Sequence, residues 1–410
     1  MIFIGFIFVF LQPKRQNNDT MERLKQRYQA QLDRTKTDFV RYLHDEIRWE
    51  ARLNAILGAR GVGKTTLMFQ HILLSGERDT SLVVFADDIY FSKHTLLDMA
   101  DTFYKNGGKH LYIDEVHKYK HWSTEIKNIY DQIPDLQIVY TGSSILDLEK
   151  GGADLSRRQL KNHMHGMSFR EWLQMTQGIV VPKLTLDEIL SAKTAFPYAE
   201  HRPLPLFKEY LRTGYFPFCC EADYLERLSA VVEQTLETDI PQFAGLSVGV
   251  MHKLKQLMQI ISQISPFKPN YSDLARDVSV ARNDLKDYLF YMEKSGMIQC
   301  LQSPAFGMTR LAKAEKIYLD NTNLMYALIG TQPDLGNLRE TFFFNQMRVR
   351  NVVTASEVSD FLMDGHTFEV GGHKKGRRQI AEVPDSFVVK DDIEYGAPGV
   401  IPLWMFGLNY

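Results

Sequence analysis

The sequence predicts an α/β protein: a parallel sheet in the first part, then a helical region, then a smaller α/β region. Three short apolar runs, at 52–57, 110–114 and 136–141, are each followed by glycine, acidic or hydroxyl-bearing residues. Continuous apolar runs are typical of parallel strands, which are buried on both faces. Stretches of helical length separate the runs, and "SLVVFADDIYF" supplies a fourth strand. Because ligands bind at the carboxyl edge of such sheets, we expect these polar residues to lie close together.

Length and composition set the class of protein. A chain of 410 residues is long enough for two to four domains. Its 44% hydrophobic and 24% charged residues are typical of a soluble globular protein, and a net charge of -2 gives no general attraction to nucleic acid or membrane. The sparse cysteines Cys219, Cys220 and Cys300 do not form a disulfide framework or a zinc site. We therefore expect a cytoplasmic protein.

Residues 1–20 begin with an apolar stretch about half as long as the ~20 residues that a membrane-spanning helix needs. They lack the basic start and cleavage site of a secretory signal. Three interpretations stay open: a leader that touches a membrane, a buried strand, or codons upstream of a true start at Met21, where a helical stretch begins. We favour the wrongly assigned start. No other long apolar run exists, so we expect no integral membrane association.

The stretch "GARGVGKT" matches the pattern G-x-x-x-x-G-K-[ST] and lies between a predicted strand and a predicted helix. Glycines let backbone N–H groups surround phosphates, and the helix N-terminus adds about half a positive charge. We expect Lys64 to contact the β- and γ-phosphates and the Thr65 hydroxyl to ligate Mg²⁺. The alternative is a glycine-rich turn without a ligand. The predicted nucleotide-binding residues are Gly58, Ala59, Arg60, Gly61, Val62, Gly63, Lys64, Thr65 and Thr66.

Two acids, Asp114 and Glu115, close the strand predicted at 110–114. At the carboxyl edge of the sheet, Asp114 suits the outer coordination sphere of Mg²⁺. Glu115 suits the general base that orients the attacking water. The alternative is a solvated acidic turn, and the presence of the lysine-containing glycine loop argues against it.

Hydroxyl groups of Thr141, Ser143 and Ser144 follow the strand predicted at 136–141. A polar side chain here can contact the γ-phosphate, and we select Ser143 for this role; a helix N-cap is the alternative. Arg157 and Arg158 come later. They are candidates to offset transition-state charge, in the same chain or across a subunit boundary, with a surface ion pair as the alternative.

The second half is predominantly helical up to about residue 300. Residues 168–240 have helical periodicity interrupted by proline-containing turns, which indicates a helical connector or lid. In 241–305 the order is helix, helix, turn, longer helix and strand, which favours a helix-turn-helix with a wing. Its recognition helix offers Arg282, Asn283 and Lys286 to DNA, but Asp284 and Asp287 on the same helix repel phosphates. The alternative, which is equally open, is a module that serves contacts with a protein partner or with a lid over the nucleotide site.

Several motifs together carry a resemblance to a known family. The chain resembles the AAA-type (ASCE) P-loop ATPases of bacteria and archaea that carry a C-terminal domain of unknown function, which are close to the STAND-like archaeal ATPases. The resemblance implies a five-stranded parallel core, MgATP binding and slow hydrolysis. Whether the protein forms an oligomer stays open. It rests on the glycine loop, "YIDE" (112–115), "TGSS" (141–144), "LSRR" (155–158), "SFREWL" (168–173) and, more weakly, "YLRTGYFP" (210–217).

The same resemblance implies a PD-(D/E)xK nuclease core in the last hundred residues. Its acids correspond to Glu340, Asp360 and Glu369. In such a site, two carboxylates hold a metal and a lysine activates water. Gly371 occupies the lysine position, and Lys374 and Lys375 lie too far along the strand to point the same way without a bend. We therefore expect a degenerate domain, with "HKKGRR" (373–378) as a solvated loop or a nucleic-acid contact.

These interpretations combine into one hypothesis: an ATPase with cofactors ATP and Mg²⁺, slow turnover and the role of a nucleotide-dependent switch. The alternatives are a DNA-binding winged-helix regulator with structural nucleotide and a metal-dependent nuclease. The predicted divisions are a leader (1–20), a P-loop ATPase domain (21–167), a helical connector or lid (168–240), a winged-helix-like domain (241–305) and a degenerate nuclease-like domain (306–410).

Overall fold

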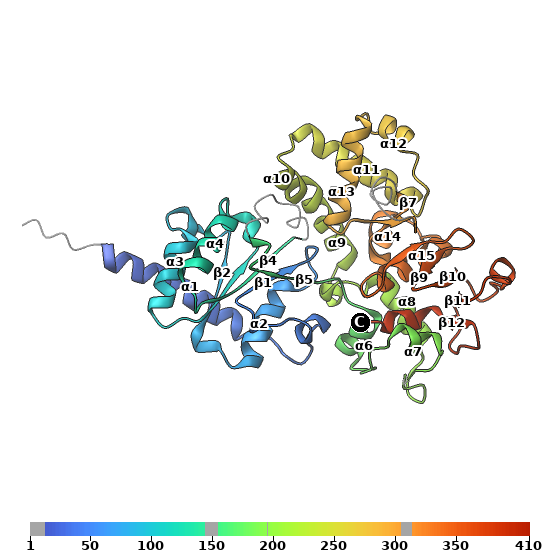
Figure 1. Cartoon of the computed structure of the whole chain (residues 1–410), viewed down its shortest axis with the longest axis horizontal. Helices are drawn as coiled ribbons and strands as arrows, with labels where there is room; N and C mark the ends of the chain where they lie inside the picture. The colour runs from blue at the N-terminus through green and yellow to red at the C-terminus, as the bar shows by residue number, and fades with distance from the viewer. Residues whose placement is uncertain (1–12, 144–154, 195, 305–313) are drawn as a thin grey trace, which may run out of the picture.

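The computed structural model describes residues 13–143, 155–194, 196–304 and 314–410. An N-terminal lobe holds α1 to β5, and a second lobe holds the helical region and the C-terminal sheet (Figure 1). Helix α1 spans Pro13–Leu32, so it begins before Met21. The three interpretations of the leader stay predictions, because residues 1–12 lie outside the described part of the chain.

The first sheet is parallel throughout and has the order β2-β3-β4-β1-β5, which confirms the predicted α/β class and five-stranded core. Four strands occupy the predicted apolar runs: β1 (Leu53–Leu57), β2 (Ser81–Phe85), β3 (His110–Asp114) and β4 (Gln137–Gly142). The edge strand β5 (Leu160–His163) has no buried residue, which is why no apolar run announces it.

Helices cover both faces of this sheet (Figure 1). They are α2 (Lys64–Ser75), α3 (Leu96–Lys105) and α4 (Trp122–Gln132), together with α1. Helix α3 illustrates why these segments form helices and pack against the sheet. Thr95 caps its first turn by accepting from the Asp98 N–H, and its apolar residues at helical spacing, Leu96, Met99, Ala100 and Phe103, are buried.

The connector is a series of short helices. They are α6 (Phe169–Gln177), α7 (Leu186–Leu190), α8 (Pro203–Thr213), α9 (Tyr224–Gln234) and α10 (Ile240–Ala244). A 3₁₀ turn at Pro217–Cys220 precedes α9, and a π-helical turn at Thr235–Asp239 joins α9 directly to α10. Both turns lie against the glycine loop.

The next elements are three helices followed by two strands. Helices α11 (Val248–Ile264), α12 (Tyr271–Asp277) and α13 (Arg282–Lys294) precede an antiparallel pair, β6 (Ile298–Gln302) and β7 (Ala314–Leu319). Strand β6 also pairs in parallel with β8 (Val353–Ala355). The chain on either side of residue 305 therefore shares one sheet, and the predicted domain boundaries stay predictions.

This second sheet is mixed and has the order β12-β11-β10-β9-β8-β6-β7. Its remaining strands are β9 (Phe361–Met363), β10 (His366–Gly371), β11 (Ser386–Lys390) and β12 (Val400–Pro402). Helices α14 (Thr322–Leu328) and α15 (Leu335–Met347) complete the region, and α15 buries Phe342, Phe343 and Phe344. In the described part of the chain, no helix combines the length and apolarity needed to span a bilayer.

Candidate functional site

The glycine loop connects the end of β1 to the first residue of α2. Gly61 and Gly63 have φ values of 85° and 99°, a region that side chains other than glycine rarely adopt. At Gly58 a Cβ atom would lie 2.3 Å from the Met164 carbonyl oxygen. The three glycines are therefore required by backbone conformation and close packing.

Lys64 turns into the loop. Its Nζ donates to the carbonyl oxygens of Gly58 and Ala59, both at 2.9 Å, and the side chain is 8% exposed. Burial lowers the pKa of Lys64, and the neighbouring acids Asp114 and Glu115 oppose that shift. The loop thus surrounds the buried ammonium group of Lys64, which donates its hydrogen bonds to carbonyl oxygens of the loop itself. Phosphate oxygens are stronger acceptors for this ammonium group.

Asp114 lies at the same edge of the sheet as Lys64. Its Oδ2 accepts from the Thr65 hydroxyl at 2.8 Å, and its other oxygen accepts from the Thr141 hydroxyl. Burial raises the pKa of Asp114, and the hydrogen bonds from the two threonines oppose the shift. A threonine hydroxyl held beside a buried carboxylate is an oxygen donor set that Mg²⁺ accepts.

Glu115 follows Asp114 with an unusual backbone. Its φ and ψ are both 50°, and its N–H donates to the Thr141 hydroxyl at 3.0 Å. A non-glycine residue in this region stores strain, which proteins retain mainly at functional sites. Thr141 therefore positions both acids. Ser143, which the sequence favoured as the phosphate contact, lines a small hollow with Lys64 and Glu115, whereas Ser144 lies outside the described residues.

Two cavities extend from the start of α2. One, of about 370 Å³, borders the glycine loop, the two acids and the 3₁₀ turn at Pro217–Cys220. The other, of about 480 Å³, is lined by Phe39, Phe69 and Gln70 among other residues, and both include Thr65 and Thr66. A polar cavity and a cavity with aromatic walls therefore lie on the two sides of Thr65 and Thr66.

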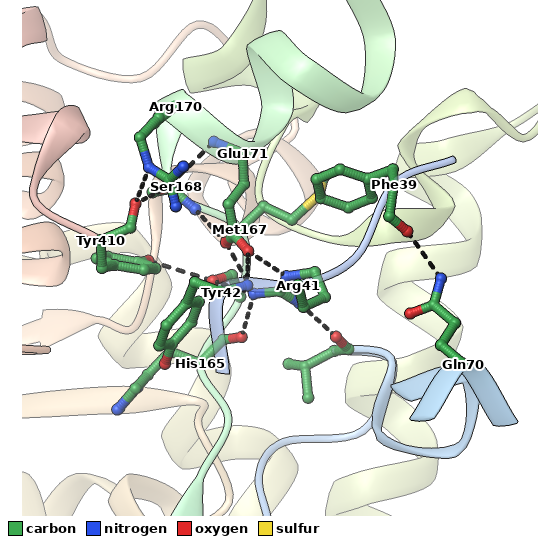
Figure 2. A network of polar contacts seen from close by, with 12 residues as sticks. Phe39, Arg41, Tyr42, Gln70, His165, Met167, Ser168, Arg170, Glu171 and Tyr410 are labelled. Carbon is green, nitrogen blue, oxygen red and sulfur yellow. Dashed lines mark hydrogen bonds and ion pairs between the residues drawn. The ribbon is translucent and has the colours of Figure 1, made fainter. Parts of the chain in front are cut away.

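Gln70 shapes the second cavity. Its amide donates to the carbonyl oxygens of Lys36 at 2.8 Å and of Phe39 at 2.7 Å. These bonds connect α2 to the segment before β1, and Figure 2 shows the one to Phe39. Sequence analysis did not identify Phe39 or Gln70 as site residues. These hydrogen bonds join residues that are 34 and 31 positions apart, so no local sequence pattern predicts them.

Arg41 connects the glycine loop to helix α6 (Figure 2). It is 4% exposed, and it donates to the Val62 carbonyl at 2.6 Å and to Glu171 Oε1 at 2.9 Å. Glu171 also forms a capping box with Ser168 at the start of α6. The Ser168 hydroxyl in turn donates to the main-chain oxygen of Tyr410 at 2.7 Å. One polar network thus links the glycine loop to the far end of the described chain.

We expect Arg41→Met to lower the free energy of unfolding by about 3–5 kcal/mol, because it leaves the Glu171 carboxylate buried and unpaired. The double variant Arg41→Met/Glu171→Met should lose less than the sum of the two single variants. Urea unfolding of the four proteins measures both effects. Arg276→Met, which removes an exposed ion pair with Asp273, is the control and should change stability by less than about 1 kcal/mol. Additive single effects would contradict the pairing.

Arg157 and Arg158 lie away from this site. They precede β5, whose first residues pair with the start of β1, so they are at the opposite edge of the sheet from Lys64. Arg158 forms an ion pair with Asp131 at 3.0 Å, and Arg157 is exposed. The geometry does not support a catalytic role within the same chain, because β5 runs parallel to β1 and starts at the far edge. A role across a subunit boundary stays a prediction.

The predicted recognition helix α13 exposes Arg282, Asn283 and Lys286, and equally Asp284 and Asp287. Its surface is therefore mixed in charge. DNA binding through this helix stays a prediction.

In the C-terminal region the chain makes the bend that Lys375 needs to point back toward the acids. A turn in which the Lys375 N–H donates to the Gly372 carbonyl at 2.9 Å brings the Lys375 side chain back to Glu369, with which it forms an ion pair. Lys375 Cγ lies 2.7 Å from where a Cβ of Gly371 would be. A residue four positions along the chain thus fills the space of the missing lysine.

The other two acids of this region also have partners in the chain. Glu340 accepts from Lys316 Nζ and the Tyr318 hydroxyl, both at 2.9 Å, and Asp360 accepts from the Val370 N–H at 2.8 Å. Burial, with Glu340 nearby, raises the pKa of Asp360 to about 6. No group of three or more His, Cys, Asp or Glu side chains in the described residues is arranged to hold a metal ion. Nuclease activity stays a prediction.

Comparisons with known proteins agree with this geometry. Residues 50–173 match a family model described as an AAA domain, and residues 204–335 match one described as a domain of unknown function, DUF8612. An uncharacterized protein of Methanocaldococcus jannaschii, MJ1637, is 26% identical over 316 residues. That match spans 72% of this chain and 64% of the relative's length, so the relative is the longer protein.

Similar solved structures include the Aeropyrum pernix ORC1 protein in complex with DNA, at 11% identity and a TM-score of 0.31 over 76% of this chain and 91% of that one. Cdc6p from Pyrobaculum aerophilum is similar at 12% identity and a TM-score of 0.27, over 80% and 95% of the two chains. AMPPCP-bound DnaA from Aquifex aeolicus is similar at 12% and 0.27, over 70% and 90%. The family match confirms the resemblance to AAA-type P-loop ATPases for residues 50–173.

Proposed function

We propose that the AAA-type domain binds MgATP between the glycine loop and the acidic pair, hydrolyses it slowly, and acts as a nucleotide-dependent switch. One observation carries the proposal: the Thr65 hydroxyl, at the start of α2, donates to Asp114, at the end of β3, beside the buried Lys64 ammonium. Phosphoryl transfer requires mainly positioning and charge neutralisation. These three side chains come from two separate segments and supply both.

The two cavities give the nucleotide an orientation. The polar cavity at the loop suits the phosphates, because it holds Lys64, Thr65 and backbone groups at a helix N-terminus. The cavity beside Phe39 and Phe69 suits the base, because aromatic walls with a few polar groups are typical of such sites. Thr65 and Thr66 belong to both and lie at the junction.

Each residue of the site has a defined task in this proposal. Lys64 exchanges its bonds to the Gly58 and Ala59 carbonyls for phosphate oxygens. Thr65 and Asp114 would hold Mg²⁺, which neutralises phosphate charge when bound. Glu115, kept in its strained backbone conformation by Thr141, accepts a hydrogen bond from the attacking water and orients it.

The connector and the segment after α13 support the switch because both lie against the glycine loop. A Cβ atom on Gly61 would lie 2.8 Å from the Phe218 ring, and one on Gly296 would lie 2.9 Å from the Ala59 side chain. The 3₁₀ turn and the segment after α13 are therefore packed closely against the loop. A change in loop conformation on nucleotide binding must move them as well.

Thermal unfolding with and without nucleotide tests the proposal. MgATP at a hundred times its dissociation constant should stabilise the protein by about 2.7 kcal/mol, whereas MgAMP, which lacks the β- and γ-phosphates that Lys64 binds, should have little effect. Equal melting temperatures in the presence and absence of MgATP would remove the proposed function.

The partners remain part of the proposal. Duplex DNA binding through α13 would weaken steeply with salt, so a salt titration tests it. If neighbouring subunits complete the site, ATP turnover per chain should rise with protein concentration. A cytoplasmic location fits the free cysteines Cys219, Cys220 and Cys300.

A further inference from the structure

A carboxylate from the connector reaches into the nucleotide site. Asp239 is the last residue of the π-helical turn between α9 and α10. It accepts two hydrogen bonds from Arg60 in the glycine loop, from Nε at 3.1 Å and from Nη2 at 3.2 Å. Lys118 Nζ, just after the acidic pair, lies 3.7 Å from its Oδ1. Two cations of the AAA-type domain therefore surround one acid of the connector.

Asp239 closes a hollow beside the catalytic groups. The hollow is bordered by Lys64, Glu115, His117 and Ser143, and its volume is about 10 Å³. A single water molecule needs about 10–15 Å³, so a phosphoryl group does not fit there unless Asp239 moves. The Asp239 carboxylate thus borders the same hollow as Lys64 and Glu115, the two groups that would contact the phosphate that is attacked.

The polar groups around the hollow suit an anion larger than a carboxylate. Arginine forms the same forked pair of hydrogen bonds with a phosphate as with a carboxylate. Both ring nitrogens of His117 are buried and have no hydrogen-bond partner among the described residues. Single-turn π-helices are also frequent at functional sites.

We propose that Arg60 and Lys118 bind the γ-phosphate of ATP, and that Asp239 occupies their site when no triphosphate is bound. The proposal rests on the proposed function. A triphosphate displaces Asp239, whereas ADP, which has no γ-phosphate, leaves the Arg60–Asp239 pair in place. Because α10 and the winged-helix elements follow Asp239 directly in the chain, its release is transmitted to them.

The alternative is that Arg60 and Asp239 form only a structural ion pair between two regions. The two accounts differ in their effect on nucleotide preference. A structural pair stabilises the protein whichever nucleotide is bound. A carboxylate that competes with the γ-phosphate weakens the binding of ATP and leaves the binding of ADP unchanged.

Asp239→Asn tests the proposal in the full chain. It removes the negative charge that repels the γ-phosphate, so we expect the ratio of MgATP to MgADP affinity to rise about tenfold, equivalent to about 1.4 kcal/mol. Glu237→Gln is the matched control, because Glu237 lies on the same turn but pairs with Lys255 at the surface. It should leave the ratio unchanged. Titration calorimetry with both nucleotides at one ionic strength gives the ratios.

Arg60→Gln is the second variant that tests the proposal. It should lower the affinity for MgATP about tenfold, again about 1.4 kcal/mol, and leave the affinity for MgADP as in the unmodified protein. Unchanged ratios in both Asp239→Asn and Arg60→Gln would overturn the proposal while the proposed function survives. Absence of binding of either nucleotide to the unmodified protein would remove both.

Discussion

Lys64→Ala lowers the affinity for MgATP by at least about 100-fold, because charge-assisted hydrogen bonds to phosphate are worth about 1.5–3 kcal/mol each and the ammonium makes more than one. In the present structure the same group makes two hydrogen bonds inside the loop, to Gly58 and Ala59. Titration calorimetry of MgATP into the full chain measures the loss.

Lys93→Ala is the control for that experiment, since Lys93 is an exposed lysine of the same lobe. It should bind MgATP like the unmodified protein. If Lys64→Ala and Lys93→Ala bound MgATP equally well, Lys64 would not contact phosphate, and the loop would be a glycine-rich turn.

Glu115→Gln binds MgATP with nearly unchanged affinity but hydrolyses it about 100- to 10,000-fold more slowly, the range that general acid–base catalysis contributes. Glutamine keeps the shape of the side chain and the backbone bond to Thr141, and it removes only the negative charge that orients water. Steady-state phosphate release and calorimetry on the same preparation separate turnover from binding.

Asp87→Asn is the matched control for charge, because Asp87 is exposed and follows β2, the neighbour of β3 in the sheet. Its turnover should equal that of the unmodified protein. A Glu115→Gln variant with full turnover would assign the general base to another residue.

Much of the first sheet could be predicted from the sequence, because its central strands are buried on both faces and are therefore continuous apolar runs. Strand β1, for example, is buried at every position. Strand β5, with the sequence "LKNH", was missed, because an edge strand with no buried residue has no apolar pattern. The glycine loop and the acidic pair were found because their chemistry requires fixed local spacing.

The rest of the site depends on contacts between distant segments. Arg60 and Asp239 are 179 positions apart, and Arg41 and Glu171 are 130 apart, so no local spacing connects them. The return of Lys375 to Glu369 depends on a bend, and the sequence showed that a bend was needed but not that the chain makes one. Sequence patterns therefore identified the groups that carry the chemistry, but not those that position or occlude them.

The central claim is that Lys64, Thr65 and Asp114 form a single site for a metal-bound triphosphate. Pulsed EPR of the full chain, with Mn²⁺ in place of Mg²⁺, tests it most directly. The account predicts that protein separated from free Mn²⁺ and ATP retains Mn²⁺ with hyperfine coupling to ³¹P, and that Thr65→Val and Asp114→Asn each lose this protein-bound signal. Mn²⁺ that binds equally well without ATP, or a phosphorus coupling that persists in both variants, would contradict it.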